Sequence, residues 1–182
     1  MNRGTRAVIA TLGIVAGAAA LWAGRAAMAA PIADGGQSAE AQQVRQEEVA
    51  RKGATVMPFD LARTTHFFDD RESGGIETVT ANDRNDAEQI RLIRRHLAAE
   101  AERFGRGDFS DPAKIHGQDM PGLSQLAGAG TRLRVTFKSL PAGASVTYAS
   151  RDKAIVAGIH EWFAAQRSDH GAHMHMDMHH QM

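Results

Sequence analysis

Twice along the chain, a segment in which apolar residues alternate as in a strand is followed by a segment in which they recur at helical spacing. This order limits the folds that the chain can adopt. Residues 64–81 are rich in Thr, aromatic and β-branched residues around a Gly-containing turn, and residues 90–104 then carry apolar side chains at helical spacing. Residues 132–150 and 155–166 repeat that order. A hairpin, helix, hairpin, helix plan would bury every apolar stripe in one antiparallel sheet with both helices on one face. We therefore expect an α+β domain over residues 55–170.

The expected boundaries come from caps and turn residues. Asn and Asp residues at 82–86 precede the first helix, and Gly105 and Gly107 end it. The second helix is predicted to begin near Ser150 and to end before Ser168. The two halves share the plan but no residue-by-residue identity, so the pattern is not a sequence repeat. The connection at residues 105–130 has Gly, Pro and Asp at regular intervals and is interpreted as a long loop.

The first 54 residues differ from the predicted domain in composition. Residues 1–29 join a short cationic start to an apolar run and a small-residue site, which predicts a secretory signal cleaved after Ala29. A retained membrane anchor over residues 7–24 is the alternative. Residues 30–54 are polar and rich in Gln, Glu and Ala, and favour either a linker or a short helix at 39–52.

Composition narrows the function. The signal segment holds three of the 21 Lys and Arg residues and none of the 21 Asp and Glu residues, which leaves the rest of the chain mildly acidic and argues against nucleic-acid binding. The chain has no Cys, so it can form neither disulfides nor a lipid anchor on a thiol. In a periplasmic or secreted protein of this kind, any metal must be held by His, Met, Asp or Glu, and no stable membrane insertion is expected after signal cleavage.

The end of the chain, residues 170–182, consists mostly of such ligands: "HGAHMHMDMHHQM". In an extended segment alternate side chains point to opposite sides, which separates a thioether edge from an imidazole edge. The even positions are Met174, Met176, Met178, His180 and Met182, and the odd positions are His173, His175, Asp177 and His179; His170 precedes them. Thioethers suit Cu(I), whereas imidazoles suit Cu(II), Ni(II) and Zn(II).

We therefore interpret residues 171–182 as a tail that binds copper first, with silver, nickel and zinc as further candidates. A chaperone, buffer or resistance factor that serves a metal transporter or oxidase would need such a tail. The competing interpretation is a solubilising end without a metal role, because chain termini tolerate biased composition.

Inside the domain, His116, Asp119 and Met120 lie within five residues of the long connection and are candidate ligands. His66, His96 and His160 are more typical of packing or hydrogen-bonding residues. An extracytoplasmic enzyme that uses His116, Asp119 and His160 is the alternative function. No G-x-S-x-G elbow, H-E-x-x-H helix or Cys nucleophile supports it, and we assign no catalytic residue.

Three segments, "VMPFDLARTTHFF", "RGDFSDPAKIHGQDMPGL" and "IHEWFAAQRSDHG", resemble a group of small secreted bacterial proteins of uncharacterised function. The resemblance covers residues 56–171. Some members carry the label aspartate carbamoyltransferase. That enzyme has a Ser-Thr-Arg-Thr-Arg phosphate loop and a His-Pro-x-Gln segment. This chain has only "ARTTH" at residues 62–66, in a predicted strand, so the motifs give the label no support.

Overall fold

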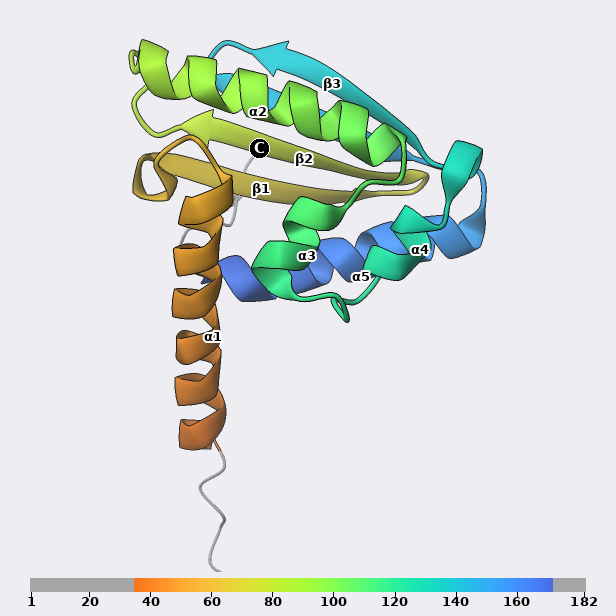
Figure 1. The fold of residues 1–182 in the computed structure, drawn as a ribbon, viewed down its shortest axis with the longest axis horizontal. Helices are drawn as coiled ribbons and strands as arrows, with labels where there is room; N and C mark the ends of the chain where they lie inside the picture. The colour runs from red at the N-terminus through yellow and green to blue at the C-terminus, as the bar shows by residue number, and fades with distance from the viewer. Residues whose placement is uncertain (1–34, 172–182) are drawn as a thin grey trace, which may run out of the picture. The chain divides into compact units, whose positions relative to one another are not determined.

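The computed structural model describes residues 35–171, with side chains from residue 39 onward. The predicted signal sequence and the tail residues His173–Met182 lie outside the described residues. Four strands form one antiparallel sheet: β1 (Thr64–Arg71), β2 (Gly74–Ala81), β3 (Arg134–Leu140) and β4 (Gly143–Ala149). The strand order is β1-β2-β4-β3, so the two hairpins meet at the middle of the sheet (Figure 1). This confirms the predicted α+β class.

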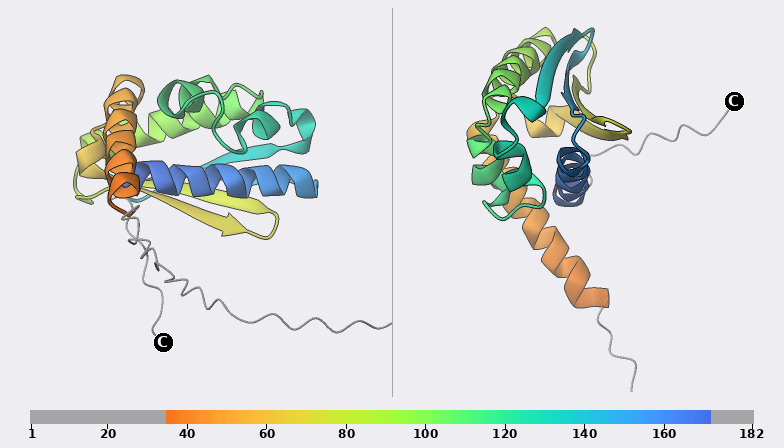
Figure 2. Two further views of the ribbon diagram at one scale, coloured as in Figure 1. Left: turned by 90° about the horizontal axis from the view of Figure 1, so that it is seen from below. Right: turned by 90° about the vertical axis from the view of Figure 1, so that its right-hand side faces the viewer.

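Two long helices cover one face of the sheet, as predicted. Helix α2 (Ala87–Gly105) packs on β3 and β4, whereas α5 (Lys153–His170) packs on β1 and β2 (Figure 2). Asp86 caps α2 by accepting from the backbone N–H of Gln89, and Asp152 caps α5 in the same way. Ser150, the expected cap of the second helix, instead bonds the backbone N–H of Asp152.

The polar segment at residues 30–54 was predicted as a linker or a short helix, and the structure corrects the length of that helix. Residues Gly35–Val56 form one helix, α1, which is longer than the expected short helix and continuous with the domain. Among the side chains of α1 that the structure describes, Val49 is the only deeply buried apolar one, while Val44 is 60% exposed. Because a single apolar contact gives little periodicity, the sequence pattern could not reveal that α1 packs against α3 and α5.

The connection at residues 105–130 is not a loop, and this prediction was wrong. It contains α3 (Ser110–His116), α4 (Leu123–Ala127) and the start of a short 3-10 helix at Gly130–Arg132; a second 3-10 helix, Leu61–Arg63, precedes β1. Phe109, Ile115 and Leu126 are buried, and Phe109 stacks on Phe104 with ring centroids 4.6 Å apart. These short helices are stabilised by packing, since neither is long enough to be stable by itself.

The second long helix also ends later than predicted. It continues through Ser168 and Asp169 to His170, because both of the last two side chains are buried against other elements. Within residues 35–171, no helix has the combined length and apolar character that crossing a membrane requires.

Candidate functional site

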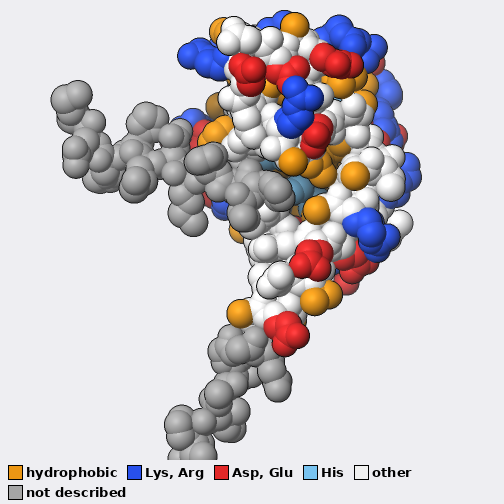
Figure 3. Space-filling model, turned by 90° about the vertical axis from the view of Figure 1, so that its left-hand side faces the viewer, with side chains coloured by type: hydrophobic (Ala, Val, Ile, Leu, Met, Phe, Trp, Pro, Cys, Tyr) orange, Lys and Arg blue, Asp and Glu red, His pale blue; other side chains and the backbone are white. Residues whose placement is uncertain are grey.

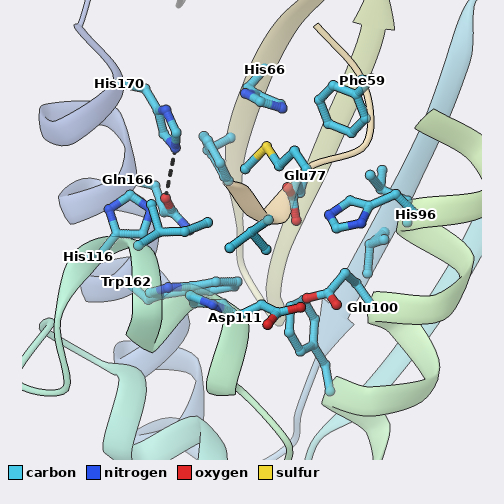
Figure 4. Close-up of a pocket in the computed structure, with 18 residues that line it drawn as sticks. Phe59, His66, Glu77, His96, Glu100, Asp111, His116, Trp162, Gln166 and His170 are labelled. Carbon is cyan, nitrogen blue, oxygen red and sulfur yellow. Dashed lines mark hydrogen bonds between the residues drawn. The ribbon is translucent and has the colours of Figure 1, made fainter. Parts of the chain in front are cut away.

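A cavity of about 50 Å³ lies between the sheet and the helices α2, α3 and α5 (Figure 4). We call it the central cavity. Its walls are mostly apolar and aromatic, with polar groups contributed by all three helices and by β1 and β2. The polar and indole-bearing side chains that line it are His66, Glu77, His96, Glu100, Asp111, His116, Trp162, Gln166 and His170.

Glu77 and Glu100 bring two carboxyl groups to the cavity. Glu77 comes from β2 and accepts a hydrogen bond of 2.8 Å from the hydroxyl of Tyr148 on the neighbouring strand β4. Burial raises the pKa of Glu77 to about 7, and the Tyr148 hydroxyl only partly opposes this rise. Burial likewise raises the pKa of Glu100 on α2 to about 7 against the opposing charge of Arg103. Both groups therefore exchange protons near neutral pH.

Arg103 binds the acidic residues at one end of the cavity. Its guanidinium donates to Glu100 at 2.9 Å, to Asp108 at 3.0 Å and to Asp111. The positive charge of Arg103 is thus fully used by these carboxylates, and it is not available to a negatively charged ligand.

Three histidines gather at the opposite side. The ring centroid of His170 lies 5.2 Å from that of His116 and 5.3 Å from that of His66. They come from the end of α5, the end of α3 and strand β1, so the topology and not the sequence spacing brings them together. On the face shown in Figure 3, histidine side chains lie in a hollow bordered by hydrophobic ones. We call these three residues the histidine cluster.

His116 is oriented by a buried acidic partner. Its Nδ1 lies 2.7 Å from Oδ2 of Asp169, and the same carboxylate accepts a two-pronged hydrogen bond from Arg45 on α1. Burial lowers the pKa of His116, although Asp169 acts in the opposite direction. Burial alone would raise the pKa of Asp169, but Arg45 and His116 outweigh it and the pKa lies below its ordinary value. A neutral His116 that donates through Nδ1 keeps the lone pair of Nε2 for a ligand or a proton.

His96 stands on the α2 side of the cavity, apart from the histidine cluster. Its ring makes an edge contact with Phe59, with centroids 5.6 Å apart. Burial lowers the pKa of His96 below its ordinary value, so this imidazole is neutral at pH 7.

The structure places the predicted site residues in different environments. His116 and His170 line the central cavity, whereas Asp119 is exposed and Met120 is buried in the hydrophobic core. His160 lies elsewhere and bonds the backbone oxygens of Arg71 and Gly74, which confirms the hydrogen-bonding role predicted for it. The proposed tail ligands from His173 onward lie outside the described residues.

Within the part of the chain that the structure describes, no three His, Asp or Glu side chains are arranged to hold a metal ion.

Sequence reasoning missed Glu77, Glu100, Asp169 and Trp162. Glu77 breaks the apolar run of its strand, since it lies on the face that also buries Val79, and this is a weak signal that the sequence does contain. Asp169 gave no signal, because its partners Arg45 and His116 are 124 and 53 residues away along the chain.

Comparisons with protein-family models, with curated proteins and with solved structures find no match to this chain. The resemblance described for residues 56–171 therefore stays a prediction, and the function is argued below from the residues themselves.

Proposed function

We propose that the protein is an extracytoplasmic binding protein for soft metal ions, with copper as the first candidate, and that it acts as a chaperone, buffer or resistance factor. The main ligands are the imidazoles and thioethers of residues 173–182. One observation carries the proposal: this run of ligands follows within three residues of His170, and the imidazole of His170 belongs to the histidine cluster.

The histidine cluster supports this function in a specific way. Metal-binding histidines are usually fixed by a carboxylate on their other ring nitrogen, and His116 has that arrangement with Asp169. The neutral state of His116 also suits a ligand, because an imidazolium cannot bind a cation. We propose that His116 adds a domain ligand to metal carried by the tail, before transfer to a transporter or oxidase.

Two sets of substitutions in the full chain test this function. In one, Met174, Met176, Met178 and Met182 become Leu; in the other, His173, His175, His179 and His180 become Gln. We expect the Met variant to lose Cu(I) and retain Cu(II), because thioethers are the soft ligands. The His variant should show the reverse pattern in competition titrations with Cu(I), Cu(II), Ni(II) and Zn(II).

The pH dependence provides a second test of the same model. Imidazoles must lose a proton before they bind metal, so Cu(II) affinity should fall as pH drops through about 6.5, whereas Cu(I) affinity should not. The same pH profile for both ions would contradict the separation into a thioether edge and an imidazole edge.

An extracytoplasmic enzyme is the second candidate function, and the Asp169–His116 pair beside the central cavity favours it. A neutral imidazole and carboxyl groups with raised pKa values are the combination that acid–base catalysts use. Hydrolysis of p-nitrophenyl acetate by the metal-free chain, abolished in His116→Gln, would favour the enzyme. A rate equal to that of buffer would remove this support.

A further inference from the structure

The central cavity has a polar group that nothing in the described structure satisfies. Trp162 is 1% exposed and lines the cavity, and its indole Nε1–H donor has no acceptor among residues 35–171. A buried donor without a partner is costly, and such groups are normally paired with protein, water or ligand. The occupant of the cavity is thus expected to supply an oxygen or nitrogen acceptor.

The aromatic packing fixes Trp162 in place. Its ring makes edge contacts with Tyr148 at 5.2 Å and with Phe109 at 5.8 Å between centroids. Side chains held this way cannot easily rotate to find another acceptor, because interiors are close-packed. The unpaired donor is therefore a property of the fold and not of one flexible side chain.

The other polar groups of the cavity define the charge of its ligand. Arg103 is bound by three carboxylates, so its charge is not available to an anion, and burial lowers the pKa of both His96 and His116. A cation would face the N–H donor of Trp162, which can bond only to an acceptor. An uncharged ligand with an acceptor atom avoids both difficulties. Tyr148 bonds to only one oxygen of Glu77, which leaves the second oxygen for a hydrogen bond to the ligand.

The volume defines the size of the ligand. The central cavity measures about 50 Å³. An engineered apolar cavity that admits benzene is about three times as large, at roughly 150 Å³. The ligand that enters is accordingly a molecule, or the end of a molecule, with only a few heavy atoms.

We propose that the central cavity is a binding site for a small uncharged carbonyl or amide group, whose oxygen accepts a hydrogen bond from Nε1 of Trp162. This proposal does not rest on the copper-binding function, although His116 lines the same cavity.

The test uses three planar molecules of equal size: acetate, acetamide and acetamidinium, which are negative, neutral and positive. The chain contains two Trp residues, so the full chain with Trp22→Phe leaves Trp162 as its only indole. We expect acetamide at pH 7 to shift the indole N–H resonance of Trp162 in a saturable way. Acetate and acetamidinium should bind about tenfold more weakly or not at all, the effect of one lost hydrogen bond or of burying a charge.

The absence of a saturable shift with acetamide would overturn the proposal, because it would mean that only water accepts the hydrogen bond from Nε1 of Trp162. Equal or stronger binding of acetate or acetamidinium would overturn it too. In a second variant, Trp162→Phe keeps an aromatic ring and removes the donor. Saturation transfer from this variant to acetamide should vanish, and transfer equal to that of the parent would contradict the assignment of Trp162.

Discussion

Two side chains, Glu77 and Glu100, link the stability of the domain to pH. Their pKa values rise from an ordinary 4.5 to about 7 in the folded protein, so the folded state binds protons more tightly than the unfolded chain. The stabilisation that results is complete below pH 4.5 and is lost as pH rises through 7. The free energy of unfolding should therefore fall between pH 5 and pH 8.

Replacing Glu77 by Gln should remove its share of this pH dependence. The amide oxygen can still accept from Tyr148, but the amide never ionises, so Glu77→Gln should be more stable than the parent at pH 8 by about 3 kcal/mol. At pH 5 the two proteins should unfold at similar urea concentrations. The matched control is Glu72→Gln in the exposed β1–β2 turn, which should change stability by less than about 0.5 kcal/mol. An unchanged pH profile in Glu77→Gln would contradict the proton-binding role of Glu77.

The helices show which contacts the sequence could not predict. The long, strongly periodic elements were predicted correctly in type and order, because alternation in the strands and the 3.6-residue repeat in α2 reflect burial on one face. Helix α1 was predicted only as a shorter helix beside the alternative of a linker, and the short helices α3 and α4 were not predicted, because their apolar residues are few and their stability comes from contacts distant in sequence. The same reason hid the Arg45–Asp169–His116 network, while His116 itself could be recognised as a candidate from its residue type.

Helix α1 offers a matched pair of valines that tests its docking. Val49 is 2% exposed and Val44 is 60% exposed, and both lie in the same helix. The change to Ala raises helix propensity equally at both positions, so a difference in stability reports burial alone. Val49→Ala should cost about 2 kcal/mol in urea unfolding and Val44→Ala about 0.5 kcal/mol or less. Equal effects would show that α1 does not pack on the domain.

The crossing of α4 and α5 depends on Gly122. Its φ is +77°, and a Cβ there would lie 2.0 Å from the backbone oxygen of Gly158. Gly122→Ala should therefore lower the free energy of unfolding by at least about 2 kcal/mol. Gly105, the last residue of α2, has open space around it, so Gly105→Ala should be neutral or stabilise by up to about 1 kcal/mol. A reversed order in thermal unfolding would contradict this packing.

The whole protein combines a packed α+β domain with a ligand-rich end of the chain. The domain holds the central cavity and brings His66, His116 and His170 together, which no sequence spacing reveals. Residues 173–182 hold four of the nine His residues and four of the eight Met residues of the chain. We therefore expect substitutions in residues 173–182 to change metal binding and substitutions in the domain core to change stability. A substitution of His116 is expected to affect both.

The most direct measurement is a copper competition titration of the full chain beside a chain that stops at Gly171. We predict that the full chain binds both Cu(I) and Cu(II) tightly and that the shortened chain loses these tight sites while it keeps its fold by circular dichroism. Tight copper binding that is equal in the two chains would contradict the tail as the metal site, and it would move the function to the histidine cluster of the domain.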